Sequence, residues 1–346
     1  MFKKSQFSRQ VTLYRYQLPM DSGVIVREQR LLQREGYIIE LYENEHGGLG
    51  ECAPLPTFSY ETLEQVEAQL LPILSTWQKT GEWPDFESLF PSVSFGLSAA
   101  KYELEQTLPQ AGEYLVAPLC SGDPDELIPV FQNMADNDRQ KVAKVKVGLY
   151  EPIRDGMLVN LFLESIPELN LRLDANRSWS LDKALKFAQY VTPELRRRIT
   201  FLEEPCHTPE LSLEFARQTG IKIAWDETLQ ETIHTPKFNV TEFDVSNFFN
   251  DQLGALVIKP TLIGSIDRCI RLIDYAKAQG LQVVISSSLE STIGLTQLAR
   301  LSAWQTPHQT PGLDTLQLFQ SQLERSWPNS VLPMAFLSEQ ALIWRS

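Results

Sequence analysis

The sequence predicts an α/β fold in which a (β/α) barrel follows a smaller α+β module. From about residue 115 to 320, short β-prone runs alternate with amphipathic segments, which is typical of repeated βα units and a parallel sheet. Residues 1–110 instead place their β-prone stretches before their helical ones. We therefore expect an N-terminal module at 1–110, a barrel at 111–320, and a C-terminal segment, 321–346, that returns to the first module.

The first module is expected to begin with three strands and continue with two helices. The β-prone stretches and then the helical ones lie near residues 10–18, 24–31, 36–43, 60–78 and 94–107. The glycine-rich run from His46 to Glu51 fits a turn and the start of a strand. It does not fit a phosphate-binding loop, because no Gly-Lys-Ser/Thr follows it.

Six short runs are expected to be strands of the barrel. They lie at residues 143–147, 170–174, 199–203, 221–226, 256–259 and 282–286. Helical segments fill the intervals, for example from Ser180, a candidate N-cap, to Val191.

A polar residue ends each of these six runs, and each interval is about one βα unit. The residues are Lys146, Asp174, Glu203, Asp226, Lys259 and Ser286, separated by 28, 29, 23, 33 and 27 residues. Because the carboxyl ends of barrel strands converge on one mouth, residues with this spacing can form a single site.

Three consecutive members of this series are carboxylates, namely Asp174, Glu203 and Asp226. Converging carboxylates repel one another unless a cation lies among them. A set of oxygen ligands without Cys or His favours Mg²⁺, with Mn²⁺ as a possible substitute. The alternative is that each carboxylate merely caps the following helix.

The lysines suggest proton chemistry beside that cation. Lys144 and Lys146 lie two residues apart on one strand face, so their mutual repulsion and a nearby dication favour loss of a proton from Lys146. A base beside a metal suits removal of a proton α to a carboxylate. The alternative for Lys144 is an ordinary solvated strand end.

The strand-end motifs resemble those of the muconate-lactonizing subgroup of the enolase superfamily, in order and spacing. These motifs are Lys144-Val145-Lys146, Asp174-Ala175-Asn176, Glu203-Glu204-Pro205, Trp225-Asp226-Glu227 and Lys259-Pro260-Thr261. The resemblance implies an enolase-type barrel closed by an N-terminal capping domain. It implies Lys146 as acid/base, Lys259 opposite it, and Mg²⁺ on Asp174, Glu203 and Asp226. The double glutamate leaves Glu203 and Glu204 as rivals, and the family pattern favours Glu203.

Short sequence segments around these motifs are similar to those of the o-succinylbenzoate synthases of the menaquinone pathway. They include residues 143–148, 171–177, 286–291 and 54–59. The resemblance implies dehydration of a cyclohexadiene carboxylate, and capping loops 20–24 and 54–59 over the mouth. Expected substrate contacts are Lys144, Arg172, Asn176, Ser286 and Gly312, with Glu227 orienting Lys259. The alternative for Ser286 is a serine-rich turn that closes a barrel strand.

Three rival functions remain open from the sequence. An N-acylamino acid racemase, dipeptide epimerase or cycloisomerase would keep the same site and use Lys146 and Lys259 on a different substrate. A Schiff-base aldolase would use a barrel lysine as a nucleophile. A non-catalytic metal-binding barrel would serve as a scaffold or sensor.

Composition argues against nucleic acid and membrane as partners, and the family resemblance implies a small-molecule carboxylate substrate. With Lys+Arg 31 and Asp+Glu 44, the net charge of −13 disfavours nucleic acid and anionic membranes. The four cysteines show no CxxC pair and the four histidines no HExxH spacing, so a disulfide framework or zinc site is not expected. We expect a cytoplasmic protein, and the family resemblance favours a monomer.

Overall fold

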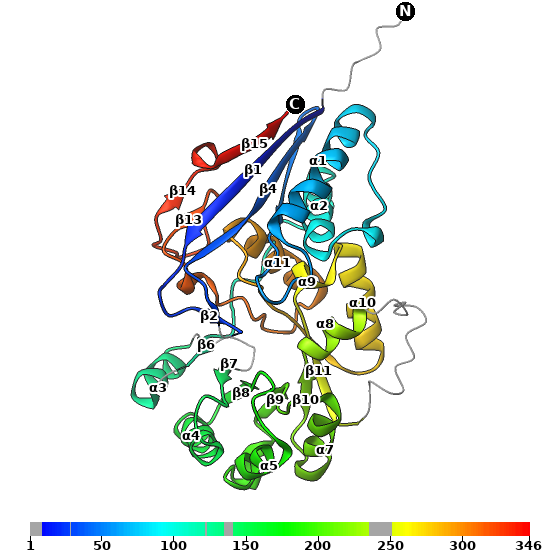
Figure 1. Ribbon diagram of the computed structural model, residues 1–346. Helices are drawn as coiled ribbons and strands as arrows, with labels where there is room; N and C mark the ends of the chain where they lie inside the picture. The colour runs from blue at the N-terminus through cyan, green and yellow to red at the C-terminus, as the bar shows by residue number, and fades with distance from the viewer. Residues whose placement is uncertain (1–8, 28, 122, 135–140, 235–250) are drawn as a thin grey trace, which may run out of the picture.

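The computed structural model describes residues 9–27, 29–121, 123–134, 141–234 and 251–346 (Figure 1). It contains an antiparallel sheet with two helices packed on it and a parallel sheet surrounded by helices. Buried hydrophobic side chains form a main core and a separate core under the antiparallel sheet.

The antiparallel sheet joins the two ends of the described chain. Its order is β15-β1-β4-β5, and its strands are β1 (Arg9–Pro19), β4 (Gln33–Glu43), β5 (His46–Cys52) and β15 (Ala341–Arg345). A small hairpin pairs β2 (Ile25–Val26) with β3 (Gln29–Arg30). Because β15 lies antiparallel to β1, the C-terminal segment returns to the first sheet of the chain.

Two helices cover this sheet, and they lie where the sequence predicted helical segments. Helix α1 (Leu63–Thr80) begins with a capping box between Thr62 and Gln65 and ends at Gly81, whose φ of 77° suits glycine. Helix α2 (Pro91–Leu104) lies directly against β5. A Cβ atom on Gly50 would be 2.0 Å from a backbone oxygen of α2, so glycine permits this close approach.

The second sheet has seven strands, and every pairing in it is parallel. Its order is β12-β11-β10-β9-β8-β7-β6. The strands are β6 (Leu119–Cys120), β7 (Lys141–Lys146), β8 (Leu169–Asp174), β9 (Ile199–Glu203), β10 (Ile223–Trp225), β11 (Leu253–Ile258) and β12 (Gln282–Ile285). All six runs predicted as barrel strands are therefore strands.

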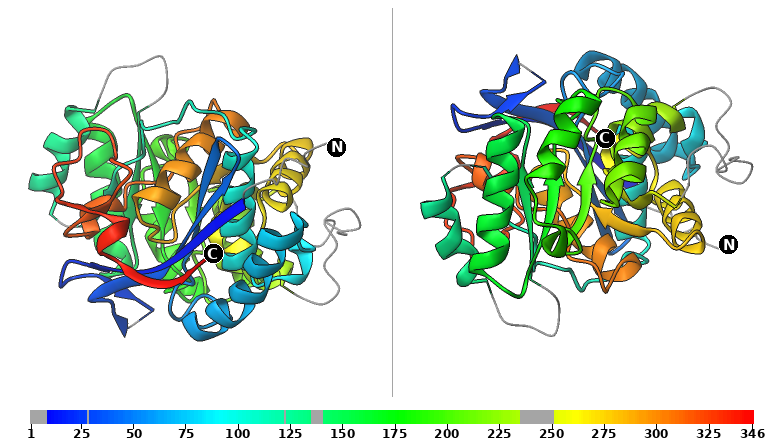
Figure 2. Two further views of the ribbon diagram at one scale, coloured as in Figure 1. Left: turned by 90° about the horizontal axis from the view of Figure 1, so that it is seen from above. Right: turned by 90° about the horizontal axis from the view of Figure 1, so that it is seen from below.

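Helices connect these strands and lie around the outside of the curved sheet (Figure 2). They are α3 (Pro124–Gln132), α4 (Pro152–Ser165), α5 (Leu181–Gln189), α6 (Pro193–Arg196), α7 (Pro209–Thr219), α8 (Glu227–Ile233), α9 (Pro260–Ile263), α10 (Ile266–Ala278) and α11 (Thr292–Gln305). Ser180 caps α5 as predicted, because its side chain accepts from the N–H of Lys183.

An extended segment near Gly312 joins the two edge strands of the parallel sheet. Gly312 forms a parallel bridge with Ser286 after β12, and Pro311 accepts a hydrogen bond from the N–H of Ala117, just before β6. The sheet is thereby closed into a barrel. The remaining short elements are η1 (Phe86–Ser88), η3 (Leu316–Leu318), β13 (Gln322–Leu323), β14 (Met334–Ala335) and η4 (Leu337–Glu339).

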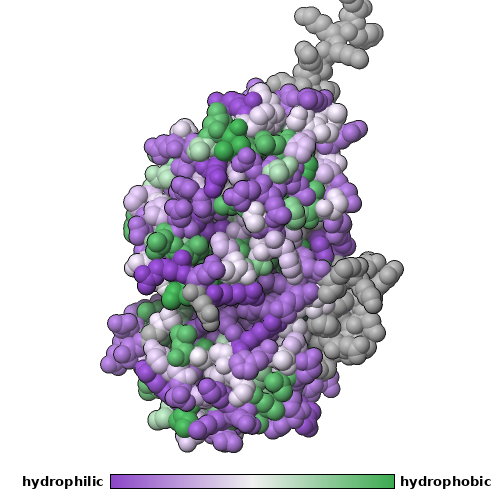
Figure 3. Space-filling view, viewed as in Figure 1, coloured by the Kyte–Doolittle hydropathy of each residue, from purple (hydrophilic) through white to green (hydrophobic). Residues whose placement is uncertain are grey.

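Hydrophilic side chains form a band across the middle of the face shown in Figure 3, and hydrophobic ones form small separate patches. Among the described residues, no helix combines the length and apolar character that crossing a bilayer requires.

Candidate active site

The polar residues predicted from the strand period lie at one edge of the parallel sheet. Each ends a strand or directly follows one, in the order Lys146 (β7), Asp174 (β8), Glu203 (β9), Asp226 (β10), Lys259 (β11) and Ser286 (β12). The register places Lys146 beside Asp174 and Asp174 beside Glu203. Ion pairs join Lys146, Asp174 and Glu203 through Lys144, and a separate ion pair joins Lys259 to Asp226. The charge of Asp226 also raises the pKa of Lys144, so the two groups form one electrostatic cluster.

Lys144 joins two of the carboxylates. Its Nζ lies 2.9 Å from Oδ2 of Asp174 and 2.7 Å from Oε2 of Glu203. The Nζ of Lys146 lies farther away, 3.8 Å from the same Asp174 oxygen. The Lys146 side chain is 30% exposed, against 15% for Lys144. Lys146 is therefore the lysine of this pair that a small molecule can reach more easily.

The carboxylate of Asp226 has a partner on each oxygen. Lys259 Nζ donates to Oδ2, and Gln230 Nε2 donates to Oδ1 at 2.6 Å. Gln230 lies one helical turn into α8, the helix that begins immediately after Asp226. The two catalytic lysine candidates, Lys146 and Lys259, thus approach the cluster from β7 and from the end of β11.

Glu204 supports this cluster, although the sequence left its role open. It accepts hydrogen bonds from the N–H of Asp226 at 3.0 Å and of Thr228 at 2.8 Å, and it pairs with Arg177 at 3.1 Å. Glu203 instead faces Lys144. Adjacent residues at a strand end point to opposite sides, which is the signal that separates the two glutamates.

Burial and mutual repulsion shift the ionisation of the cluster unequally. Burial opposes ionisation of Asp174, but the ammonium groups of Lys144 and Lys146 hold its pKa below the ordinary value. Burial and the charge of Asp174 raise the pKa of Glu203 well above its usual range. Burial would lower the pKa of Lys144, yet Asp174 and Glu203 raise it. An additional cation beside Glu203 would favour its ionised form.

The side chains present fit a hard divalent cation. Asp174, Glu203 and Asp226 offer oxygen ligands, and Oε1 of Glu203 is buried without a hydrogen-bond partner among the described residues. The ammonium groups of Lys144 and Lys259 lie against these carboxylates. As placed, no three or more acidic, His or Cys side chains of the described residues are gathered as a metal-binding set. The three carboxylates would have to come closer together to hold one cation.

Three more predicted residues lie close to the cluster. Arg172 is buried and donates to the carbonyl of Thr310 at 2.6 Å, and burial lowers its pKa to about 10. Asn176 donates to Oε1 of Glu227 at 3.2 Å. Burial would lower the pKa of Lys259, but the charge of Asp226 and, less strongly, that of Glu227 raise it above the ordinary value. The influence of Glu227 on Lys259 is thus electrostatic in the described contacts.

Ser286 and Gly312, the two residues that the resemblance places at the succinyl end of the substrate, are adjacent in the structure. Ser286 Oγ donates to the carbonyl of Gly312 at 3.1 Å, and the N–H of Gly312 donates to the carbonyl of Ile285 at 2.9 Å. The N–H of Gly312 itself is therefore already paired. A backbone donor for a carboxylate here has to come from a neighbouring residue.

The 54–59 loop reaches the cluster from the first module. The ring of Phe58 lies 5.5 Å from Nζ of Lys259, and Arg27 donates to the carbonyl of Thr57 at 2.8 Å. A cavity of about 270 Å³ lies beside this loop, with Phe58 and Glu227 among its lining residues. The loop therefore covers part of the barrel mouth, on the side of Lys259.

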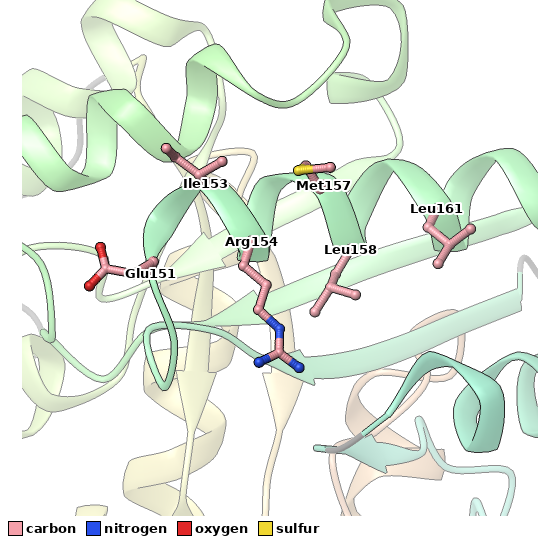
Figure 4. Close-up of a pocket in the computed structure, with 6 residues that line it drawn as sticks. All are labelled: Glu151, Ile153, Arg154, Met157, Leu158 and Leu161. Carbon is pink, nitrogen blue, oxygen red and sulfur yellow. The ribbon is translucent and has the colours of Figure 1, made fainter.

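A second cavity, of about 600 Å³, lies on the outer side of α4 and has a different character. It is lined by Glu151, Ile153, Arg154, Met157, Leu158 and Leu161 (Figure 4). None of the predicted site residues contributes to it. This cavity is therefore separate from the predicted site at the barrel mouth.

Comparison with known proteins gives the family of this chain. The family model described as "MenC, N-terminal domain" matches residues 8–104, and "Enolase C-terminal domain-like" matches residues 129–331. The o-succinylbenzoate synthase of Vibrio cholerae is 60% identical over 98% of both chains, and that of Aliivibrio salmonicida is 54% identical over 96% of this chain and 98% of that one. The chain belongs to the o-succinylbenzoate synthase family.

Solved structures of this superfamily share the fold. An o-succinylbenzoate synthase from Thermosynechococcus elongatus, complexed with magnesium in its active site, is 22% identical with a TM-score of 0.70, covering 90% of this chain and 95% of that one. An L-Ala-D/L-Glu epimerase from Bacillus subtilis is 17% identical with a TM-score of 0.68, covering 90% and 91%. Similar scores for a synthase and an epimerase show that the fold alone does not select the reaction.

Proposed function

We propose that this chain converts 2-succinyl-6-hydroxy-2,4-cyclohexadiene-1-carboxylate to o-succinylbenzoate and water in menaquinone biosynthesis. The observation that carries this proposal is the ion-paired cluster of Lys144, Lys146, Asp174 and Glu203 at the carboxyl edge of the parallel sheet, in a chain of this family. The cluster supplies a lysine for proton transfer beside carboxylates that suit a divalent cation.

Lys146 carries the proton in this mechanism. Its neutral amine removes the proton from the ring carbon that bears the carboxylate. The resulting ammonium then gives that proton to the departing hydroxyl group on the neighbouring carbon. One C–H bond and one C–O bond break, water leaves, and the new double bond completes the aromatic ring. The exposure of Lys146, greater than that of Lys144, fits this role.

Asp174, Glu203 and Asp226 would hold one Mg²⁺, with Mn²⁺ as a substitute. When bound, such a cation neutralises charge that develops on the substrate carboxylate as the proton is removed. Lys144 positions two of these carboxylates. Lys259, paired with Asp226, would place its positive charge against the ring on the side opposite Lys146.

Ser286 and the segment around Gly312 would receive the succinyl end of the substrate. Their adjacency is consistent with this placement. A serine hydroxyl and backbone N–H groups can donate to a carboxylate. Arg172 lies behind the same segment, because it bonds to Thr310.

The direct test is to incubate the purified chain with the cyclohexadiene carboxylate after chelation and again after adding Mg²⁺. We expect formation of o-succinylbenzoate only with the metal, followed by absorbance and identified by mass spectrometry. A parallel series with Mn²⁺ tests the substitution. A folded chain that forms no product at saturating metal would contradict the proposal.

A racemase or epimerase of the same superfamily is the competing function, because Lys146 and Lys259 reach the cluster from different strands. Such an enzyme would exchange the α-hydrogen of an N-acylamino acid or dipeptide with solvent deuterium, and would lose no water. Running both substrate classes in deuterium oxide separates the two functions.

A further inference from the structure

Two segments from different parts of the chain meet around one buried arginine, Arg34, at the barrel mouth. One is the 54–59 loop, and the other is the turn formed by residues 286–291, called here the serine turn. The serine turn is organised from inside by Glu290, which accepts from Ser287 Oγ at 2.6 Å and from the N–H of Ser288 at 2.7 Å. Leu289, in the middle of the turn, has a φ of 63°. Because this left-handed conformation is unfavourable for leucine, other contacts must stabilise it.

The far end of the serine turn is fixed by Glu51 of β5. Glu51 accepts from the N–H of Ser291 at 2.8 Å and from the N–H of Gly294 at 2.9 Å, at the start of α11. Tyr16 donates to the same carboxylate at 2.6 Å. A buried carboxylate at a helix N-terminus is a favourable arrangement. The end of the serine turn is thus held by the antiparallel sheet.

Arg34, near the start of β4, connects the middle of the serine turn to the 54–59 loop. Its guanidinium donates to the carbonyl of Leu289 at 2.9 Å and more weakly to that of Ser288 at 3.4 Å. It also donates to the carbonyls of Ala53 at 2.6 Å and Pro54 at 2.7 Å, where the 54–59 loop begins. The residue is 1% exposed, so these bonds replace its hydration.

We propose that Arg34 is a positioning residue that sets substrate affinity, an inference that rests on the proposed function. Arg34 holds the 54–59 loop and the serine turn at one separation, so that Ser286 and the covering loop meet the substrate in a fixed arrangement. In the described contacts it touches neither Lys146 nor Lys259, which are placed by their strands and carboxylates. Loosening Arg34 therefore affects binding more than proton transfer.

Arg34→Lys tests this inference, because lysine keeps the charge but lacks the planar fork that reaches carbonyls on two loops. We expect KM for the cyclohexadiene carboxylate to rise roughly tenfold or more, with a smaller change in kcat. An unchanged KM would overturn the proposal.

Arg198 offers a matched control at the opposite end of the barrel. It also binds only backbone carbonyls in the described contacts, those of Leu163, Ile166 and Leu169, and it directly precedes the first residue of β9. Arg198→Lys should lower thermal stability without changing KM. An equal rise of KM in both variants would mean that general destabilisation, and not loop positioning, causes the effect.

Amide hydrogen exchange measures the positioning without any turnover. Arg34→Lys should speed exchange in the 54–59 loop and the serine turn, and Arg198→Lys should leave both at the native rate. Native exchange rates in Arg34→Lys would overturn the proposal. If the native chain lacks dehydratase activity but the exchange rates change as expected, the proposed function is wrong and the positioning role of Arg34 stands.

Discussion

The core under the antiparallel sheet and the mouth of the barrel are both buried, but the first consists of apolar side chains and the second of charged ones. The first packs apolar side chains of α1 and α2 against β1 and β4, among them Leu13, Leu70 and Trp77. The second buries Asp174, Glu203 and Asp226 with two lysines. Apolar burial stabilises the fold, whereas buried ion pairs offset much of their attraction by desolvation.

This difference indicates what each region is for. A core whose side chains all gain by leaving water needs no further explanation than stability. A cluster that raises the pKa of Glu203 by burial and by repulsion from Asp174 is poorly explained by stability alone. The proposed chemistry, a base beside carboxylates that would hold a metal ion, explains it. Substitutions in the two regions should therefore separate activity from stability.

The largest expected effect is at the mouth. Lys146→Arg keeps a positive charge but installs a group too basic to accept a proton at neutral pH, so turnover should fall by ~10²–10⁴-fold. Turnover should fall less in Lys259→Arg if Lys259 acts only through its charge. Equal losses in both variants would favour two-base chemistry. Circular dichroism and saturating Mg²⁺ control for folding and metal occupancy.

Leu70→Ala should lower stability and leave turnover unchanged, the reverse of the effect expected at the mouth. Leu70 lies in α1 and is fully buried in the core under the antiparallel sheet, so truncation should lower the free energy of unfolding by about 2–5 kcal/mol. Turnover per folded molecule should be unchanged at a temperature where the variant remains folded. Denaturant unfolding and activity assays on the same sample measure the unfolding free energy and the turnover. Lost turnover with native stability would mean that the two regions do not separate activity from stability.

Glu204 should make the stability of the chain depend on pH. Burial and the charge of Glu227 raise its pKa to about 7 from 4.5, against the opposing effect of Arg177. The folded state therefore binds more protons than the unfolded state between these values, and stability should fall as pH rises from about 4.5 to about 7. The contribution is of the order of 3 kcal/mol.

Glu204→Gln provides the test, because the amide cannot titrate. Denaturant unfolding of the metal-free chain at several pH values should show a flatter dependence in the variant over this window. An identical slope in both proteins would mean that Glu204 does not titrate there.

The smallest effect is expected on the outer surface of α4. Met157 is 59% exposed and lines the cavity remote from the predicted site residues. Met157→Ser should change the unfolding free energy by about 0.5 kcal/mol or less and leave turnover unchanged. A clear loss of turnover would mean that the α4 surface contributes to activity.

The period of the strands made much of this molecule predictable. Lys146, Asp174 and Glu203 could be placed together from sequence because parallel strands of similar length end at one edge. The helical segment starting at Ser180 could be located from its cap. Ser286 followed from the same spacing, whereas its placement near Gly312 came from the family resemblance.

Contacts between distant parts of the chain could not be predicted in this way. Arg34 meets Leu289 across 255 positions, and Glu51 meets Ser291 across 240. No periodicity links such pairs, because they depend on how the two sheets pack. For Glu203 and Glu204 the family resemblance favoured Glu203, and the side-chain directions at the end of β9 add that Glu203 faces Lys144 and Glu204 faces the N–H of Asp226.

Calorimetric titration of Mg²⁺ into the chelator-treated chain tests the central claim most directly, namely that the buried charges at the mouth serve a metal. We expect one Mg²⁺ per native chain, and affinity reduced roughly tenfold or more in each of Asp174→Asn, Glu203→Gln and Asp226→Asn. Arg198→Lys, at the other end of the barrel, should bind like the native chain. Native affinity in all three carboxylate variants would mean that these carboxylates do not bind the metal.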